Sequence, residues 1–119
     1  MSKAASLMIA ALRGAVDCTG AGEGTSLPLD QVIENHSVQL SWSGTGTLSA
    51  LIVALEGSLD GANFFALNTA HECTGAEITA KAALFHVTLV PVAYVRYNVT
   101  TITESVAGTV LLKILWCGC

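Results

Sequence analysis

Four segments of this chain alternate apolar and polar residues with a period of two, and this pattern constrains the fold more than any other feature. In Ser37–Trp42, Val38 and Leu40 fall on the same side as Trp42, with polar residues between them. Successive side chains of a β-strand point to opposite faces, so the pattern predicts strands that each bury one face. The same alternation recurs over Ala82–Val90, Tyr94–Thr100 and Thr109–Trp116.

Further strand and turn signals lie between these segments. Leu48–Glu56 is a nearly continuous apolar run, which is typical of a strand covered on both faces. Asp60-Gly61 suits the positive φ of hairpin turns and precedes an aromatic strand, Phe64–Leu67. Only two segments have a sequence that is compatible with a helical turn, Ala4–Leu12 and Ile78–Ala82. We therefore predict an all-β fold, an antiparallel, jelly-roll-like β-sandwich of about 7–8 short strands.

The shared face of each strand also predicts the core. Residues on these faces should pack between the two sheets, away from water. In Ala82–Val90, this inward set includes Leu89. The predicted core consists of Leu40, Trp42, Ile52, Phe64, Phe85, Val87, Val95, Tyr97, Leu112 and Ile114.

The chain is predicted to form a single domain preceded by an arm. Its 119 residues match the size of one domain. We expect residues 1–26 to form an N-terminal arm with a Gly-rich loop, and residues 27–119 to form the β-sandwich domain. The arm is either a strand or an extension docked on a neighbouring subunit. We favour contacts between subunits, made by Leu7, Met8, Ile9 and Leu12, because an exposed apolar arm would promote aggregation.

The composition predicts an assembly of several chains. Hydrophobic residues make up 52% of the chain and charged residues 12%, against about 25% charged residues in an average chain. A surface with so few charges exposes apolar patches, which usually mark contact sites. We therefore expect a homo-oligomer, with a trimer favoured. Tyr94 and Arg96, on the outer face of their strand, are further candidate interface residues, because a guanidinium binds carboxylates and stacks on rings.

Charge and hydropathy exclude two classes of partner. The formal net charge is −4 and the five basic residues are scattered, whereas nucleic-acid binding needs clustered Lys and Arg to neutralise phosphates. The apolar runs Ala4–Leu12 and Leu48–Leu55 are shorter than the ~20 residues that a helix needs to cross a membrane. We therefore expect no nucleic acid and no membrane among the partners.

The four cysteines leave three interpretations open. Cys18, Cys73, Cys117 and Cys119 lack the paired C-x2-4-C spacing of a strong zinc site. They could instead form disulfides, either Cys18 with Cys73 or each with the C-terminal pair, and that pair could also crosslink subunits. In the third interpretation, all four are free and act as small apolar residues.

The sequence carries no catalytic motif. The histidines do not belong to an H-E-x-x-H pattern, and no serine lies in a G-x-S-x-G pattern. His71-Glu72-Cys73 has residue types that bind a metal or activate a thiol, but a polar loop is the simpler interpretation. Glu56 and Asp60 could pair or bind calcium, although capping of the turn by Asp60 is the simpler role. We assign no catalytic residue, no cofactor and no metal, and expect a protein that is not an enzyme.

Two segments carry a resemblance to known proteins. Glu56–Phe64 reads E-G-S-L-D-G-A-N-F, and Tyr94–Tyr97 reads Y-V-R-Y. With the closing strand Gly108–Leu111, they resemble the G-S-x-D-G-x-x-W/F … Y-V-R pattern of small β-sandwich proteins from tailed-phage virions. The pattern is more weakly similar to that of discoidin-type carbohydrate-binding modules. This chain has Phe64 where tryptophan is commoner, and its cysteine-rich ends belong to neither group.

The resemblance implies a structural function. Members of the phage group decorate capsids or sit at the neck and tail. It therefore implies a non-enzymatic capsid decoration or cement protein that binds the major capsid protein or another virion protein, in a virion assembled in the host cytoplasm. The alternatives are a neck or tail component and a carbohydrate-binding module. A sugar-binding module needs exposed aromatic side chains, and most aromatics of this chain are predicted to face inward.

Overall fold

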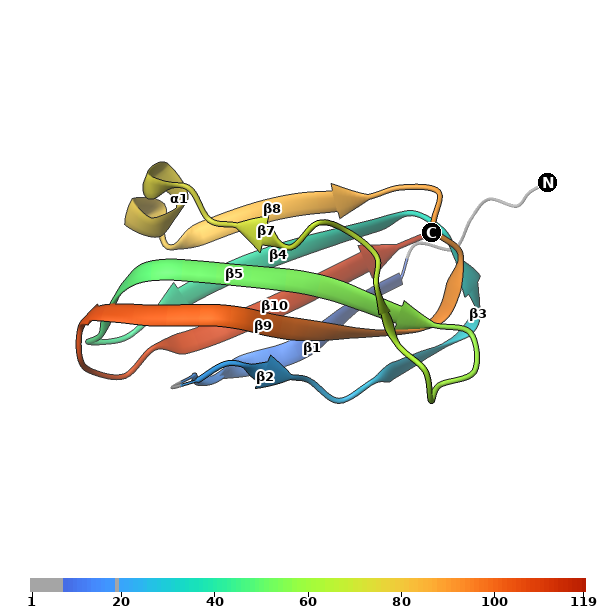
Figure 1. The fold of residues 1–119 in the computed structure, drawn as a ribbon, viewed down its shortest axis with the longest axis horizontal. Helices are drawn as coiled ribbons and strands as arrows, with labels where there is room; N and C mark the ends of the chain where they lie inside the picture. The colour runs from blue at the N-terminus through green and yellow to red at the C-terminus, as the bar shows by residue number, and fades with distance from the viewer. Residues whose placement is uncertain (1–7, 19) are drawn as a thin grey trace.

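The computed structural model describes residues 8–18 and 20–119, which form two antiparallel sheets packed face to face (Figure 1). The four-stranded sheet contains, in spatial order, β1 (Met8–Asp17), β10 (Leu111–Gly118), β4 (His36–Ser43) and β8 (Ala82–Val87). The six-stranded sheet contains β2 (Gly22–Glu23), β9 (Val92–Val106), β5 (Thr47–Ser58) and β6 (Phe65–Ala66). In this second sheet, β3 (Leu27–Ile33) also pairs with β9, and β7 (His71–Glu72) also pairs with β5. A short helix, α1 (Gly75–Ala80), leads from β7 to β8.

The order of the strands is that of a jelly roll. Both β2 and β3 pair with β9, and both β6 and β7 pair with β5, so each of these two pairs occupies one strand position. This leaves eight strand positions, four in each sheet. The spatial orders β1-β10-β4-β8 and β2-β9-β5-β6 are those of a double-sheet jelly roll. The prediction of an antiparallel, jelly-roll-like sandwich of about 7–8 strands is confirmed.

The core lies between the two sheets. Alternation identified the inward face of β4, β8, β9 and β10, and on β10 this face extends to Trp116, the largest fully buried side chain. The eight predicted core residues that are buried are Leu40, Trp42, Phe85, Val87, Val95, Tyr97, Leu112 and Ile114.

The core predictions for Ile52 and Phe64 are wrong. On β5, Leu51, Val53 and Leu55 are fully buried, and Ile52 lies on the opposite face, beside β7. A continuous apolar run contains no alternation that would show which face points inward. Phe64 lies on the outer side of the sheet, where the guanidinium of Arg96 covers its ring.

Several elements differ from the predicted boundaries. The longest strand, β9, extends beyond the predicted Tyr94–Thr100 at both ends. The strand β8 ends at Val87, because Leu89 has a left-handed φ of 61° and is 74% exposed, so the prediction that Leu89 faces inward is wrong. The strand β6 covers only the middle of the predicted strand Phe64–Leu67, and α1 begins three residues before the predicted helical turn Ile78–Ala82. Within residues 8–18 and 20–119, no helix is long and apolar enough to cross a membrane.

The described part of the predicted N-terminal arm is a strand of the sandwich. Along its length, β1 pairs with β10, and it forms one edge of the four-stranded sheet. Met8 and Leu12 pack against the core, whereas Ile9 is 69% exposed. A strand was one of the two alternatives for the arm. Leu7 lies outside the described residues, and contacts of the arm with a second subunit stay a prediction.

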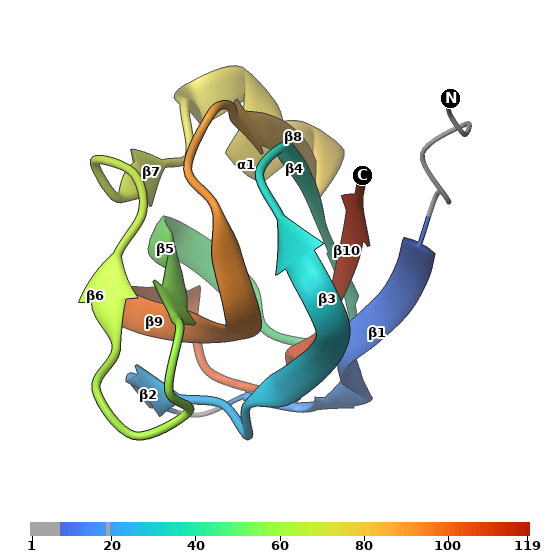
Figure 2. The ribbon, with the colours of Figure 1, turned by 90° about the vertical axis from the view of Figure 1, so that its right-hand side faces the viewer.

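Arg13 links the two sheets at the side of the sandwich formed by β1. Its Nη1 donates to the hydroxyl of Tyr97 on β9 at 2.9 Å, and its Nε donates to the carbonyl of Leu112 at 3.1 Å. The side chain thus connects the edge strand of one sheet with the centre of the other. Figure 2 shows β1 and β9 on opposite sides of the sandwich interior.

Candidate functional site

The turn after β5 is closed by the side chains of Ser58 and Asp60. The Ser58 hydroxyl donates to Asp60 Oδ1 at 2.8 Å and accepts from the backbone N–H of Gly61 at 2.9 Å. Asp60 Oδ1 also accepts from the N–H groups of Ala62 and Asn63, both at 2.9 Å. Gly61 has a φ of 77°, the left-handed conformation that favours glycine. Asp60 therefore caps the turn.

These hydrogen bonds should make the turn sensitive to acid. The N–H groups of Asn63 and Ala62 hold the pKa of Asp60 well below its usual value of 3.8. A carboxylate whose pKa is lowered by folding adds stability that is present above about pH 4 and is lost as the pH falls toward the folded-state pKa. We expect the Tm of the natural chain, followed by circular dichroism, to fall more steeply between pH 4 and pH 2 than that of Asp60→Asn. Equal slopes would contradict the capping role.

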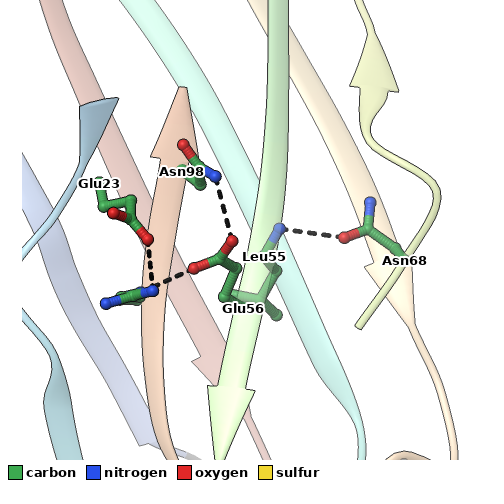
Figure 3. Close-up of polar contacts among 6 residues, drawn as sticks. Glu23, Leu55, Glu56, Asn68 and Asn98 are labelled. Carbon is green, nitrogen blue, oxygen red and sulfur yellow. Dashed lines mark hydrogen bonds and ion pairs between the residues drawn. The ribbon is translucent and has the colours of Figure 1, made fainter. Parts of the chain in front are cut away.

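Arg96 and Glu56 form the centre of a polar network on the outer face of the six-stranded sheet (Figure 3). Arg96 Nε donates to Glu56 Oε1 at 2.7 Å, and Arg96 Nη2 forms an ion pair with Glu23 of β2. Glu56 Oε2 accepts from the Asn98 amide at 3.0 Å. The guanidinium also stacks 4.2 Å from the centroid of the Phe64 ring. The sequence analysis expected Arg96 to contact a carboxylate or a ring of a partner. In the structure, both the carboxylate and the ring belong to the same chain as Arg96.

The structure places the candidate interface residues on both sheets. Tyr94 lies next to the network, and its ring packs so closely on Gly61 that a Cβ there would lie 3.0 Å from it. The candidates Met8, Ile9 and Leu12 belong to β1, in the opposite sheet. The predicted residues therefore do not form one continuous surface, and their role as interface residues stays a prediction.

The outer face of the four-stranded sheet carries almost no charge. Figure 2 shows β1, β10, β4 and β8 side by side in one layer. The residues that alternate with the buried ones face outward. With histidine neutral, the formal charges among the residues described on this face are Lys113 and, at its edge, Asp17, which pairs with Leu111. We call this surface the uncharged face. It consists of Ile9, Ala11, Asp17, Ser37, Gln39, Ser41, Ser43, Ala82, Leu84, His86, Leu111, Lys113, Leu115 and Cys117.

The uncharged face is continuous across its strands. A shallow depression of about 260 Å³ is lined by residues of β1, β4, β8 and β10, including Ile9, Leu84 and Leu115. Ile9 and Leu84 are 69% and 54% exposed. The face therefore offers apolar side chains set among serine and glutamine side chains.

A cleft of about 400 Å³ lies at the end of the sandwich where β5 ends. Its apolar lining includes Leu59, Leu67 and Phe65, of which Phe65 is 69% exposed. Ser58 and Asp60 also line it, but both already bond within the turn. Few polar groups are therefore left for the hydroxyls of a ligand.

A second polar cluster lies where the chain passes from β7 through α1 to β8. Thr74 Oγ1 accepts from the Glu77 N–H, and Glu77 Oε1 accepts in return from the Thr74 N–H, which forms a capping box. Glu77 Oε1 thereby lies 3.1 Å from Nε2 of His71, whose ring stacks on Phe85. The donor atoms of His71, Cys73 and Glu77 all lie within 4.8 Å of one another. Burial, and next the Glu77 carboxylate, raise the pKa of the Cys73 thiol to about 11.

The sequence analysis singled out His71 and Cys73 of this cluster but missed Glu77. The signal that could have found it is T-x-x-E at Thr74–Glu77, a helix-start pattern in which the glutamate folds back toward the cap. The interpretation of this segment as a polar loop is incomplete, because the capping box orders it.

All four cysteines are free thiols in the structure. The N–H of Cys18 donates to the carbonyl of Val110, which lies seven residues before Cys117 on one extended segment. At about 3.4 Å per residue, roughly 24 Å separate Cys18 from Cys117, whereas a disulfide needs Cα atoms within about 7 Å. One chain therefore cannot join Cys18 to Cys117 or bind a metal with all four cysteines, and crosslinks between subunits stay a prediction.

Comparisons with known proteins show the fold. No family model and no curated protein matches the chain. Solved structures that are similar to it include the PBSX exported protein XepA (14% identity, TM-score 0.61, 99% of this chain and 39% of XepA), CBM32-3 from a family 31 glycoside hydrolase of Clostridium perfringens (12%, 0.59, 96% and 76%), and the SPBc2 prophage-derived protein YomS (11%, 0.55, 98% and 99%).

These likenesses confirm, for the fold, the resemblance to phage proteins and to discoidin-type modules. The chain spans 39% of the length of XepA but nearly all of YomS. At identities of 11–14%, these likenesses do not assign a function to any residue of this chain.

Proposed function

We propose that this chain is a non-enzymatic structural protein of a phage virion, a capsid decoration or cement subunit that assembles as a homo-oligomer through the uncharged face. The observation that carries the proposal is the contrast between the two outer faces. The uncharged face exposes Ile9 and Leu84, and its formal charges among the described residues are Lys113 and, at its edge, Asp17. The opposite outer face carries the network of Glu56 and Arg96, in which each charge already has a partner.

Physical reasons favour the uncharged face as the contact surface. Cores of protein interfaces are depleted in charged residues, because a buried charge loses its hydration. Contiguous apolar patches on a protein surface usually mark interaction sites. The exposed leucine and isoleucine side chains of this face would be covered by a second copy or by a virion protein without loss of any ion pair.

The proposed partners are further copies of the chain, with a trimer favoured, and the major capsid protein or another virion protein. The proposed location is the virion, assembled in the host cytoplasm, and a position at the neck or tail would use the same surface. The likeness of the fold to YomS, which is prophage-derived, supports a phage origin. Among the β1 residues that were predicted to contact another subunit, Ile9 lies on the uncharged face.

A carbohydrate-binding module is the second candidate function. The cleft near Phe65 and the likeness of the fold to CBM32-3 favour it. Against it, Trp42 and Trp116 are buried, and Phe64 is covered by Arg96. Aromatic side chains that could stack on a sugar are therefore scarce on the described surface.

Leu84→Lys should weaken the assembly. Leu84 is 54% exposed, so the substitution adds a charge to the uncharged face without removing a core side chain. We expect the dissociation constant of the oligomer to rise at least about tenfold, which corresponds to 1.4 kcal/mol. Size-exclusion chromatography with light scattering over a concentration series measures it, against a chain mass of 12.3 kDa.

Thr103→Lys is the matched control, because Thr103 is an exposed residue of β9 in the other sheet. This variant should assemble like the natural chain. A natural chain that stays monomeric and binds glycans would favour the carbohydrate-binding alternative. Equal weakening by the two lysines would show that the uncharged face is not the contact surface.

A further inference from the structure

We propose that His71, Cys73 and Glu77 form a binding site for a single Zn²⁺ ion. The three residues belong to β7, to the position that follows β7 and to the first turn of α1. They offer one nitrogen, one sulfur and one oxygen donor. Zinc binds all three donor types, whereas Ca²⁺ and Mg²⁺ take oxygen ligands. Three protein ligands leave the fourth tetrahedral position to water.

The distances fit tetrahedral coordination. Donor atoms bound at 2.0–2.3 Å and at tetrahedral angles lie about 3.3–3.7 Å from one another. Nε2 of His71 lies 3.1 Å from Oε1 and 3.3 Å from Oε2 of Glu77. All three donor groups lie within 4.8 Å of one another. The Cys73 sulfur therefore needs to move by about 1 Å at most, which a small rotation about one side-chain bond provides.

Other contacts already hold each ligand in place. The ring of His71 stacks on Phe85 at 5.1 Å between centroids, and the capping box with Thr74 fixes the Glu77 carboxylate. The Cys73 backbone donates to the carbonyl of Leu51 at 3.0 Å. Supporting contacts of this kind orient the ligands of natural metal sites. The site is therefore largely formed before an ion binds.

Burial and charge also fit an ion at this place. Cys73 is 8% exposed, and its sulfur lies within 4.8 Å of a ring nitrogen of His71 and a carboxylate oxygen of Glu77. The side chains of His71 and Glu77 are each 23% exposed, so an ion can enter from solvent. A thiolate and a carboxylate together balance the charge of Zn²⁺, and binding of Zn²⁺ by the thiol releases its proton to water.

The ion would stabilise the connection between the two sheets. The segment from β7 through α1 links the edge of the six-stranded sheet to β8 of the four-stranded sheet (Figure 1). An ion that binds the folded chain and not the unfolded chain raises its stability by mass action. This site is independent of the uncharged face and of the proposed virion function.

Titration with Co²⁺, which reports thiolate ligation by its absorption spectrum, tests the site. The protein is the full chain, stripped of metal with EDTA and carrying Cys117→Ser and Cys119→Ser, so that the C-terminal Cys-Gly-Cys cannot bind. One equivalent of Co²⁺ should produce a sulfur-to-cobalt charge-transfer band and tetrahedral visible bands, which Zn²⁺ displaces. In this background Cys73→Ser should lose the charge-transfer band, and Glu77→Gln should bind at least about tenfold more weakly. Cys18→Ser, the other buried thiol, is the matched control and should bind normally.

Thermal unfolding gives a second, independent measurement. Zn²⁺ at 100 times its dissociation constant should raise the Tm of the background chain by about 10 °C, and Cys18→Ser should show the same rise. Cys73→Ser should fold in EDTA, as judged by circular dichroism, and its Tm should not rise with Zn²⁺. If Cys73→Ser fails to fold, the weakened binding of Co²⁺ by Glu77→Gln tests the site instead. Absence of a charge-transfer band with the background chain, an equal band in Cys73→Ser, or no rise in Tm overturns the proposal.

Discussion

Trp116→Ala should lower the free energy of unfolding by about 3–5 kcal/mol, the largest effect expected of any single substitution in this chain. Trp116 is fully buried on β10, and its removal leaves a cavity between the sheets. Its Nε1 also donates to Nδ1 of His36 at 3.0 Å, while Nε2 of His36 lies 3.1 Å from the carbonyl of Val90. An indole N–H can only donate, so His36 is neutral with its proton on Nε2. Burial accordingly lowers the pKa of His36.

Chemical unfolding followed by circular dichroism measures this effect, and two further variants divide it into parts. Trp116→Phe keeps most of the volume but leaves Nδ1 of His36 without a donor, which should cost about 1–3 kcal/mol. Leu115→Ala, at the next position of β10 and on the uncharged face, should cost less than about 1 kcal/mol. If Leu115→Ala and Trp116→Ala were equally destabilising, the inward face of β10 would be wrongly assigned.

Arg96→Ala should lower the free energy of unfolding by about 2–3 kcal/mol, because it removes the charged partner of a carboxylate that is largely withdrawn from water. The side chain of Glu56 is 13% exposed, and without Arg96 it keeps the Asn98 amide at 3.0 Å. The substitution also uncovers the ring of Phe64. Arg96→Lys should recover only part of the loss, because an ammonium cannot bind two carboxylates with the planar geometry of a guanidinium.

Glu23→Gln is the control for this prediction. Glu23 pairs with the same guanidinium, but its side chain is 50% exposed, so its loss should cost less than about 1 kcal/mol. A double-mutant cycle with Glu56→Gln isolates the pair of Arg96 and Glu56. If Arg96→Ala left stability unchanged and instead weakened assembly, Arg96 would be an interface residue, as the sequence analysis expected, and the network would be incidental.

Local alternation was enough to predict β4, β8, β9 and β10 and the direction of most of their side chains. Leu112 and Ile114 were predicted to face inward and are fully buried, and Arg96 was predicted to face outward and does. A period of two is a property of a single strand and needs no knowledge of its neighbours. Where the pattern is absent, as around Ile52 in the apolar run of β5, the inward face could not be predicted.

The candidate sites depend on strands that are distant in the sequence. Arg96 lies 40 residues from Glu56 and 73 from Glu23, and Glu77 meets His71 only because a helix begins between them. The uncharged face combines strands from both ends of the chain with two from its middle. The sequence by itself determined the strands that alternate, their inward faces and the scarcity of charge. Only the tertiary structure decided which strands lie side by side, because strand pairing is selected by the burial of all the apolar faces together, whereas alternation acts within one strand.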